Sequence, residues 1–295
     1  MNILVTGAKG QLGTEIQKCF ERGYTELGVP EILKQSNSVR YIDLDELDIA
    51  DLNAVRTVIG EGKFDVVINC AAYTNVNMAE GEGKDVAFKA NAIGPRNLAI
   101  ACEEIGAKLI HVSTDYVFAG DGNKPYVEYD VCAPQSVYGA TKYLGEEYVK
   151  QFSTKYFIVR TSWLYGYYGK NFVKTMMNIA RERGACKVVC DQRGNPTNAC
   201  DLAHHLLKLA TSEQYGIYHG TGNGECSWFE FTQKIVELAG IDAEVSPCTS
   251  DEFPSPVKRP SYSSLDNSMF RCTVGDEFRD WQDALKCFME NYKGE

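Results

Sequence analysis

Tyr138 and Lys142 are spaced so that both side chains could act on one substrate group. They lie four residues apart at the start of a helix-like stretch, 138–148, and positions i and i+4 share one face of a helix. A tyrosine has a pKa near ~10, and lowering it by ~3 units takes ~4 kcal/mol of preferential stabilisation of the phenolate. A fixed ammonium can supply part of that, so the pair could donate a proton to a carbonyl group. Since a Tyr-x-x-x-Lys spacing alone is common, its context decides the interpretation.

Two hydroxyls precede this pair at the end of an apolar run. The run at 108–113 ends in Ser113 and continues as Thr114-Asp115. Ligands of open parallel sheets bind at the carboxyl ends of the strands. Ser113 or Thr114 could therefore hydrogen-bond a substrate carbonyl oxygen and stabilise it as it becomes an alkoxide.

A glycine-rich turn follows the first apolar run. Gly7, Gly10 and Gly13 lie between a strand-like segment, 2–6, and a helix-like segment, 11–22. Glycine permits a tight turn and a close backbone approach to a pyrophosphate, whose charge the N–H groups of a helix N-terminus then bind. The G-x-x-G-x-x-G spacing is one residue longer than the usual dinucleotide fingerprint. We interpret the turn as a dinucleotide site because strand, turn and helix occur in the expected order.

Asp43 is the candidate acid for the adenosine ribose of such a cofactor. It closes the apolar run at 39–43 and lies 30 residues after Gly13, more than the usual ~20, which indicates an insertion around 28–38. An acid there favours NADH over NADPH, but Arg40 and Lys9 are close in sequence. Both cofactors therefore remain open.

The elements that must position these residues alternate between strand and helix patterns. Strands are expected at 2–6, 39–43, 66–69, 108–113 and 157–161, with helices at 11–22, 51–60 and 84–104. This alternation predicts an α/β fold, a Rossmann-type doubly wound parallel sheet with a smaller mixed α/β substrate lobe. We expect a dinucleotide-binding domain at 1–165, with a return of the chain around 198–222, and a substrate-binding lobe at 166–295 with helices at 172–183, 199–210 and 228–239. The loop at 246–264 has prolines at 247, 254, 256 and 260 and is either a rim over the site or a plain surface connection.

Composition narrows the class of protein. The net charge of -10 disfavours a nucleic-acid partner, which needs clustered Lys and Arg. The eleven cysteines include no C-x-x-C pair, so reduced thiols are expected rather than a disulfide framework or zinc site. The chain starts without a signal-like segment and has no apolar run of ~18 residues. We expect a cytoplasmic protein with no membrane partner.

Several longer motifs resemble the extended short-chain dehydrogenase/reductase superfamily and, within it, the dTDP-4-dehydrorhamnose reductase family. The resemblance covers nearly the whole chain and is carried by GAKGQLG at 7–13, ELDIAD at 46–51, NCAAYTNV at 69–76, STDYVF at 113–118, VYGATK at 137–142, RTSWLYG at 160–166, NFVKTM at 171–176 and DQRGNPT at 191–197. The last four favour this family over the epimerases and dehydratases that share the first half.

The resemblance implies reduction of the C4 ketone of dTDP-4-dehydro-L-rhamnose to dTDP-L-rhamnose, a step in polysaccharide biosynthesis, with hydride from NADPH or NADH. Tyr138 would donate the proton, Lys142 would hold the cofactor ribose and lower the pKa of Tyr138, and Thr114 would tune Tyr138 and contact the sugar beside Asp115 and Trp163. Further cofactor contacts would come from Gly7, Gly10, Gln11, Leu12 and Gly13 at the pyrophosphate, Asp43 at the ribose, Asp48 and Ile49 at the adenine, Ala71, Ala72 and Tyr73 at the centre, and Val112 under the nicotinamide.

The sequence also departs from the family pattern and leaves alternatives. Asn77 replaces a usual aspartate and Cys70 interrupts an alanine stretch. Some members are magnesium-bridged dimers, but Glu15 alone matches such a ligand, so no metal is predicted, while Mg²⁺ and the choice of monomer or homodimer stay open. Asn171 and Arg259 are further candidate contacts to the nucleotide sugar.

Two other functions remain as competing hypotheses. One is a nucleotide-sugar epimerase or dehydratase, although Asp115 is not followed by the glutamate that a dehydratase would use. The other is a non-catalytic, cofactor-binding regulatory subunit, against which the intact Tyr138, Lys142 and Thr114 argue.

Overall fold

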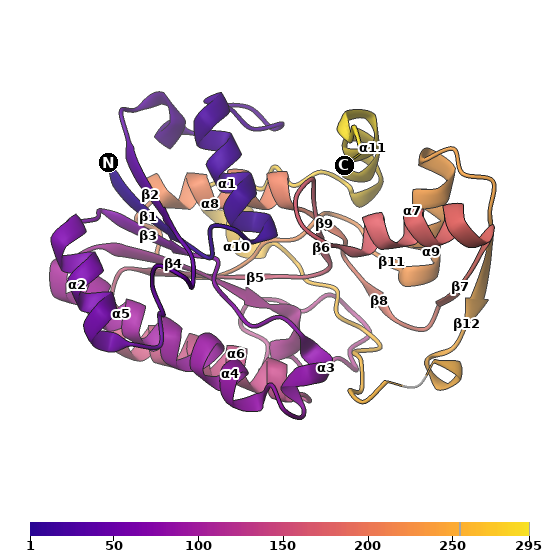
Figure 1. The fold of residues 1–295 in the computed structure, drawn as a ribbon, viewed down its shortest axis with the longest axis horizontal. Helices are drawn as coiled ribbons and strands as arrows, with labels where there is room; N and C mark the ends of the chain where they lie inside the picture. The colour runs from indigo at the N-terminus through magenta and orange to yellow at the C-terminus, as the bar shows by residue number, and fades with distance from the viewer. Residues whose placement is uncertain (254, 295) are drawn as a thin grey trace.

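A parallel six-stranded sheet forms the centre of the protein, for which a computed structural model describes residues 1–253 and 255–294 (Figure 1). Its strand order is β10-β5-β4-β3-β1-β2, and every neighbouring pair is parallel. The strands are β1 (Asn2–Thr6), β2 (Ser38–Ile42), β3 (Val66–Asn69), β4 (Lys108–Thr114), β5 (Tyr156–Thr161) and β10 (Gly216–His219). The strand order reverses between β1 and β3, which is where an open α/β sheet binds a dinucleotide. The predicted fold class is confirmed.

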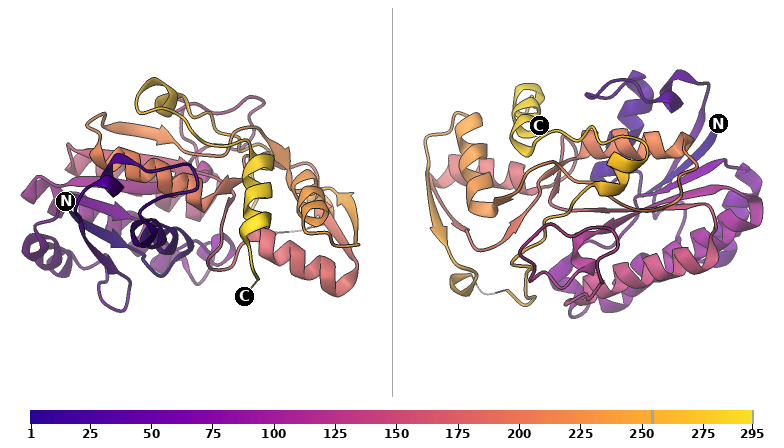
Figure 2. Two further views of the ribbon diagram at one scale, coloured as in Figure 1. Left: turned by 90° about the horizontal axis from the view of Figure 1, so that it is seen from above. Right: turned by 180° about the vertical axis from the view of Figure 1, so that it is seen from behind.

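Helices cover both faces of the sheet (Figures 1 and 2). Helices α1 (Gln11–Arg22) and α8 (Ala199–Thr211) lie on one face, and α2 (Leu52–Gly62), α5 (Gly94–Ile105) and α6 (Val137–Phe152) on the other. Because side chains alternate along a strand, Ile3 and Val5 of β1 join the core beneath α1, whereas Leu4 joins the core beneath α2 and α5. Burial on both faces explains the unbroken apolar run of β3, all four of whose residues are buried.

The helix predicted at 84–104 is broken in the structure. It consists of α4 (Lys84–Phe88), a π-helical turn η2 (Lys89–Ile93) and α5, which has Pro95 in its first turn. Proline is tolerated there because the first N–H groups of a helix have no intrahelical partner. The apolar periodicity alone did not distinguish this arrangement from one continuous helix. A short helix α3 (Val76–Ala79) precedes it.

A smaller lobe lies beside the carboxyl ends of β4 and β5 (Figure 1). Its core is a cluster of apolar side chains from three helices and a short sheet, including Met177, Phe231 and Phe288. The elements are α7 (Phe172–Arg183), α9 (Trp228–Leu238), α11 (Trp281–Asn291), the parallel pair β7 (Ala185–Val189) and β12 (Glu244–Cys248), and the short pairs β8 (Arg193–Gly194) with β11 (Cys226–Ser227) and β6 (Leu164–Tyr165) with β9 (Thr197–Asn198).

The chain passes between the two lobes more than once. It returns to the sheet through α8 and β10, within the range 198–222 named above. It returns again through α10 (Ser268–Cys272), which contacts β10 and brings Phe270 into the core of the sheet. The sequence had not predicted this second return, because five helical residues carry too little periodicity.

Short 3-10 turns complete the chain. The turn η1 (Glu31–Lys34) occupies the insertion after α1 and buries Ile32 against α8, so the insertion has a packing role. The others are η3 (Asp115–Val117) and η4 (Ser250–Glu252).

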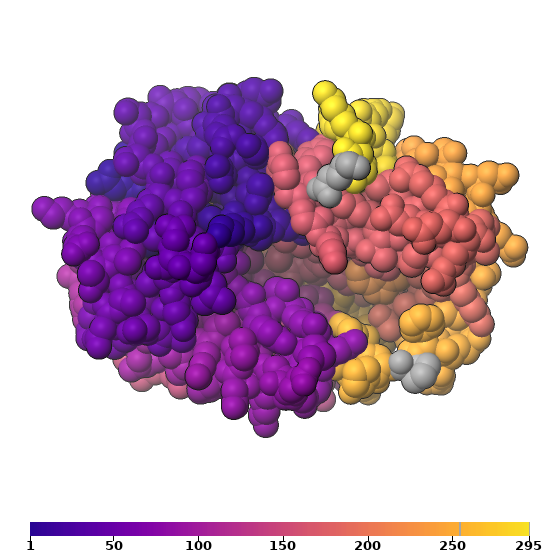
Figure 3. Space-filling view, viewed as in Figure 1, coloured from indigo at the N-terminus to yellow at the C-terminus, as the bar shows by residue number. Residues whose placement is uncertain are grey.

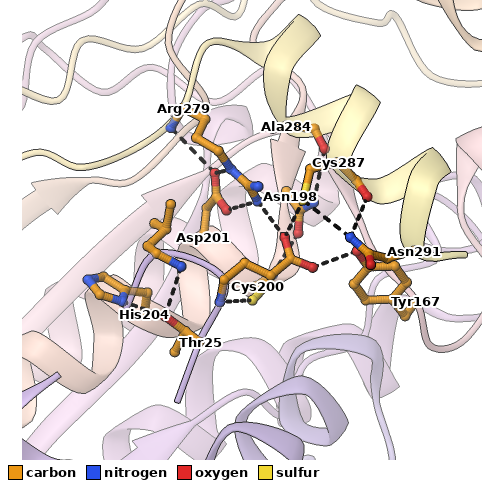
Figure 4. A network of polar contacts seen from close by, with 12 residues as sticks. Thr25, Tyr167, Asn198, Cys200, Asp201, His204, Arg279, Ala284, Cys287 and Asn291 are labelled. Carbon is orange, nitrogen blue, oxygen red and sulfur yellow. Dashed lines mark hydrogen bonds and ion pairs between the residues drawn. The ribbon is translucent and has the colours of Figure 1, made fainter. Parts of the chain in front are cut away.

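A polar network joins the two lobes (Figure 4). Arg279, just before α11, binds Glu26 after α1 at 2.7 Å and also pairs with Asp201 of α8. Tyr167 donates to the same Glu26 at 2.6 Å. A bidentate guanidinium holds carboxylates in a fixed geometry, so this cluster fixes the smaller lobe against the sheet.

All eleven cysteines are free thiols, and most are buried. Across residues 1–253 and 255–294, none of the helices combines the length and apolar character needed to cross a membrane.

Candidate active site

The glycine turn after β1 has a backbone that other residues would not fit. Gly7 has a φ of +67°, and a Cβ placed there would lie 2.6 Å from the backbone nitrogen of Ala71. A Cβ on Gly13 would lie 2.3 Å from the carbonyl oxygen of Gly7. Gly10 is the N-cap of α1, and no described side chain caps that helix end. The first N–H groups of α1 are therefore available to an anion, and the turn fits a pyrophosphate.

Asp43 lies one residue after β2 and closes this turn from the other side. Its Oδ2 accepts a hydrogen bond from the backbone N–H of Lys9 and its Oδ1 one from that of Leu44, each at 2.8 Å. The ammonium of Lys9 pairs with Asp45 at 2.6 Å on the surface. Carboxylate oxygens can accept further hydrogen bonds, so Asp43 can hold the turn and still bind a ribose hydroxyl.

Asp48 and Ile49 lie in the loop that follows. Asp48 accepts the N–H of Ala50 at 2.9 Å, and Asn97 of α5 donates to the carbonyl oxygens of Ile49 and Ala50 at 3.0 and 2.9 Å. Ile49 is buried, and its side chain lies against Gly94, where a Cβ would approach it to 2.4 Å. The loop at the expected adenine end is therefore fixed from α5.

Ala71, Ala72 and Tyr73 follow β3 and are held by two buried asparagines. Asn69 accepts the N–H of Ala71 at 3.1 Å. Asn91 accepts the N–H of Tyr73 at 2.8 Å and donates to its carbonyl oxygen at 3.0 Å. Neither asparagine was predicted as a site residue from the sequence, although a polar amide within an apolar segment can indicate such a role. Asn91 lies in the π-helical turn η2, and π turns recur at functional sites.

Tyr138 and Lys142 lie in the first turns of α6, which Ser136 caps by accepting the N–H of Gly139 at 3.1 Å. Both side chains are buried, at 9% and 2% exposure. The ammonium of Lys142 donates to the carbonyl oxygen of Val112 at 2.7 Å. Burial lowers the pKa of Lys142 to about 8, and the negative charge of Glu146 opposes that change.

The phenol of Tyr138 is a protonated group in this environment. Burial raises its pKa, and a hydrogen bond with Thr114 opposes the rise. Thr114 donates in turn to Oδ1 of Asp115 at 2.8 Å. Burial raises the pKa of Asp115 to about 6. The three groups form a chain at the carboxyl end of β4.

Ser113, the other hydroxyl considered for the substrate oxygen, points away from this chain. It donates to Oε1 of Glu146 at 2.5 Å inside the protein. Glu146 also pairs with Arg160 of β5, with Nη2 to Oε2 at 2.7 Å. Because side chains alternate along β4, Thr114 faces Tyr138 and Ser113 does not. The sequence analysis missed the pair of Glu146 and Arg160, although Glu146 follows Lys142 at helical spacing.

A cavity of about 740 Å³ extends from Asp115 and Tyr116 into the smaller lobe. In Figure 3, the surface is hollowed between the atoms of the first half of the chain and those of the smaller lobe. Trp163 and Trp228 form one wall and stack with ring centroids 3.5 Å apart. Trp163 has a φ of +47°, a conformation that costs energy for a non-glycine residue. This backbone places Trp163 in the wall of the cavity rather than in a core.

The loop at 246–264 supplies the rim of the cavity, one of the two roles considered for it. Arg259 lines the cavity, and its guanidinium donates to the hydroxyl of Tyr116 at 3.0 Å and to Oδ1 of Asn77 at 2.6 Å. Other lining residues from this loop are Phe253, Ser255, Pro256, Pro260 and Ser263. Pro254 lies outside the described residues.

Asn171, a candidate contact to the nucleotide sugar, lies at the start of α7. It accepts the N–H of Lys174 as the N-cap of α7 and donates to Oε1 of Gln11 at 2.9 Å. It lies outside the set of described residues that line the cavity. Asn171 therefore contacts the cofactor turn and not the expected sugar site.

Glu15 is fully buried within the chain. It lies between α1 and α8 with Cys19 and Cys200, and the three ligand-type atoms are within 4.8 Å of one another. Burial raises the pKa of Glu15 to about 7. Mg²⁺ prefers oxygen ligands, whereas two of these three groups are thiols, so this cluster does not fit the magnesium bridge considered above.

Comparison with known proteins identifies the family that the sequence motifs resemble, over nearly the whole chain. The family model described as RmlD substrate binding domain matches residues 1–293. A dTDP-4-dehydrorhamnose reductase of Streptomyces griseus is 40% identical over 290 residues, covering 96% of this chain and 91% of that protein.

Two solved structures are also similar over nearly their full length. A dTDP-4-dehydrorhamnose reductase from Clostridium acetobutylicum has a TM-score of 0.92 at 47% identity, covering 98% of this chain and 99% of that one. One from Bacillus anthracis in complex with NADP has a TM-score of 0.91 at 42% identity, covering 98% of both chains. The chain therefore belongs to the family of the RmlD substrate binding domain.

Proposed function

We propose that this protein reduces the C4 ketone of dTDP-4-dehydro-L-rhamnose to dTDP-L-rhamnose, using NADPH or NADH. The strongest support is the chain of Tyr138, Thr114 and Asp115 at the carboxyl end of β4, beside a cavity with an aromatic wall. The relatives named above are reductases of this sugar, and one was solved with NADP.

The residues present fit a nicotinamide cofactor, because the glycine turn leads into the N-terminus of α1, which no described side chain caps. Gly10, Gln11 and Leu12 would bind its pyrophosphate, and Val112 would lie beneath its ring. When bound, the cofactor supplies the hydride. Lys142 would exchange its bond to the oxygen of Val112 for the cofactor ribose, a movement within reach of a long side chain.

Tyr138 donates the proton that completes the alcohol. Its raised pKa keeps the phenol protonated at neutral pH, so the O–H bond of Tyr138 breaks as the O–H bond of the product forms. Thr114 donates its only hydroxyl proton to Asp115, so its oxygen would orient the phenol of Tyr138. Lys142, a cation below a pKa of about 8, stabilises the phenolate until a solvent proton restores the phenol.

Both nicotinamide cofactors are expected to bind. Asp43 would accept ribose hydroxyls in NADH, while Lys9, an exposed cation whose N–H donates to Asp43, would meet the 2′-phosphate of NADPH. Lys9 would leave its surface pair with Asp45, and such pairs are worth little. Lys9→Ala should therefore weaken NADPH more than NADH.

The cavity suits a nucleotide sugar. Trp163 and Trp228 offer flat apolar faces to a sugar ring or base, and Arg183 and Arg259 line the same cavity as cations for a diphosphate. Since all eleven cysteines are free thiols, we expect the protein to work in a reducing compartment such as the cytoplasm.

Tyr138→Phe tests the proposal. Removal of a general acid costs about 10²–10⁴-fold in rate, and we expect a loss of that size in NADPH oxidation with dTDP-4-dehydro-L-rhamnose. Unchanged thermal unfolding and NADPH binding would show that the variant is folded and loaded. Equal turnover by the variant would refute the role of Tyr138.

Product analysis of the wild type separates the competing functions. One new alcohol per NADPH consumed supports reduction. An isomerised or dehydrated sugar without net NADPH consumption would instead indicate an epimerase or dehydratase, and NADPH binding without turnover a regulatory subunit.

A further inference from the structure

Asp115 is a buried carboxyl group that the reduction does not require. It is 5% exposed and lines the cavity. Its Oδ1 accepts the hydroxyl of Thr114, whereas its Oδ2 is buried and accepts no hydrogen bond of ordinary length from the residues that the structure describes. The hydroxyl of Ser263 and the backbone N–H groups of Asp115 and Tyr116 are near enough to favour the charged form, but none of them makes a hydrogen bond of ordinary length to Oδ2. One carboxylate oxygen is thus left for another partner.

An unpartnered buried polar atom is costly, and in native proteins it often marks a catalytic role. Desolvation makes the carboxylate of Asp115 a stronger base than an exposed one, and its pKa of about 6 is close to neutral pH. A group that is mostly ionised but readily protonated is suited to moving protons in both directions. Oδ1 is held by the hydrogen bond from Thr114, whereas Oδ2 has no hydrogen-bond partner among the described residues.

The proposed substrate brings acidic C–H bonds to this place. Hydrogens on the carbons next to a ketone become acidic when the ketone oxygen is hydrogen-bonded, because the enolate charge is then stabilised. Tyr138 is the group that gives its proton to that oxygen, and it is linked through Thr114 to Asp115, which accepts the hydroxyl of Thr114 at 2.8 Å. Each of these carbons is one bond from the carbonyl carbon, so a ketone whose oxygen is held at Tyr138 would bring them near Asp115, which lines the cavity.

We propose that Asp115 removes and returns a hydrogen on a carbon adjacent to the ketone, so that this protein also exchanges that hydrogen with solvent. The inference rests on the proposed function, because it requires a bound 4-keto sugar. It adds a second activity, keto-enol exchange, which does not depend on hydride transfer.

The step balances without an oxidant or reductant. The C–H bond breaks, an O–H bond forms on Oδ2 of Asp115, and the electron pair forms a C=C bond as the ketone oxygen takes the proton of Tyr138. The proton on Oδ2 exchanges with solvent water while the enol is bound, and reversal then restores the ketone with a solvent-derived hydrogen on carbon. Because one carboxylate removes and delivers the proton on the same face, configuration is retained and no epimer forms.

Incubation of the intact protein with dTDP-4-dehydro-L-rhamnose in D₂O, without NADPH, tests this activity. We expect the sugar to gain deuterium at one carbon next to the ketone, faster than in a sample without protein, with mass spectrometry giving the gain and NMR its position and configuration. Asp115→Asn should slow the exchange by about 100-fold or more, within the range for loss of a general base.

Asp121→Asn is a matched control, since Asp121 is an exposed acid in the segment that follows β4, and it should exchange like the wild type. Far-UV circular dichroism and NADPH binding establish whether Asp115→Asn is folded. The wild-type measurement decides even where that variant is unstable, because no gain of deuterium above the protein-free sample overturns the proposal. Full exchange by folded Asp115→Asn also overturns it, and so does an epimerised sugar.

The outcomes distinguish this inference from the proposed function. Reduction with NADPH but no exchange would reject only the inference. Exchange without reduction supports the inference and rejects the reductase, and the absence of both rejects both.

Discussion

Glu146→Gln should destabilise the protein strongly, because it breaks a buried ion pair while preserving the shape of the side chain. Glu146 is 0% and Arg160 is 2% exposed, and their contacts are 2.7 Å from Nη2 and 3.0 Å from Nε. Removal of one partner from such a pair costs about 3–5 kcal/mol, since the remaining charge stays buried. The nearby His219 is neutral, because burial lowers its pKa to about 3, and it offers Arg160 no negative charge. Typical total stabilities are about 5–15 kcal/mol, so the loss is a large fraction.

The same substitution has a second, chemical readout. The charge of Glu146 opposes the lowering of the pKa of Lys142, so its removal should move that pKa further below about 8. Activity that needs the charged lysine should then decline at lower pH than in the wild type. A merely structural role of Glu146 would reduce stability without moving the pH profile.

Urea unfolding followed by far-UV circular dichroism is the suitable assay, because helices lie in both lobes. Tryptophan fluorescence would miss the sheet domain, since Trp163, Trp228 and Trp281 all belong to the core or wall of the smaller lobe. Glu147→Gln is the control, because the neighbouring Glu147 is 41% exposed and pairs with Lys150. Exposed pairs contribute about 0–1 kcal/mol. An equal loss for both variants, or a loss below about 1 kcal/mol for Glu146→Gln, would refute this reasoning.

Three further predictions follow from the site. Because burial lowers the pKa of Lys142 from 10.5 to about 8, kcat/KM should fall as pH rises through about 8, and a flat rate profile to pH 10 would contradict this. The contribution of Lys142 to the stability of the fold should rise with pH between about 8 and 10.5, because in that range only the unfolded chain holds the proton. Gly13→Ala should weaken NADPH binding at least tenfold in a fluorescence titration, because its Cβ would lie 2.3 Å from the oxygen of Gly7, whereas Gly60→Ala, which has open space, should bind normally. Arg259→Ala should raise the KM for the nucleotide sugar about tenfold, as expected for a lost charged hydrogen bond, with kcat nearly unchanged in steady-state assays; an unchanged KM would remove Arg259 from the site.

The cofactor half of the protein could be predicted because its signals are local. The glycines at 7, 10 and 13 lie within seven residues, and Tyr138 and Lys142 lie four apart on one helix. The parallel sheet could be predicted because buried parallel strands read as unbroken apolar runs, as in β3.

The features of the site that could not be predicted from the sequence depend on contacts between segments that are distant along the chain. The bond of Asn91 to Tyr73 spans 18 residues, and the ion pair of Glu146 and Arg160 joins a helix to a strand. The choice between Ser113 and Thr114 depended on which face of β4 each occupies, and a shift of one residue reverses the faces. The rim role of Arg259 rests on a contact with Tyr116, 143 residues away.

The bond between Asn171 and Gln11 implies an order of events. Gln11 is the first residue of α1, whose N–H groups are expected to bind the cofactor, and its amide also donates to the carbonyl oxygen of Leu164 at 3.2 Å. Asn171 holds the same amide while it begins α7, one wall of the sugar cavity. Binding of the cofactor to the glycine turn should therefore stabilise the position of α7 before the sugar binds. We expect an ordered binding mechanism in which the cofactor binds first. Product inhibition would then be competitive between the two nicotinamide forms and noncompetitive between the oxidised nicotinamide and the sugar substrate.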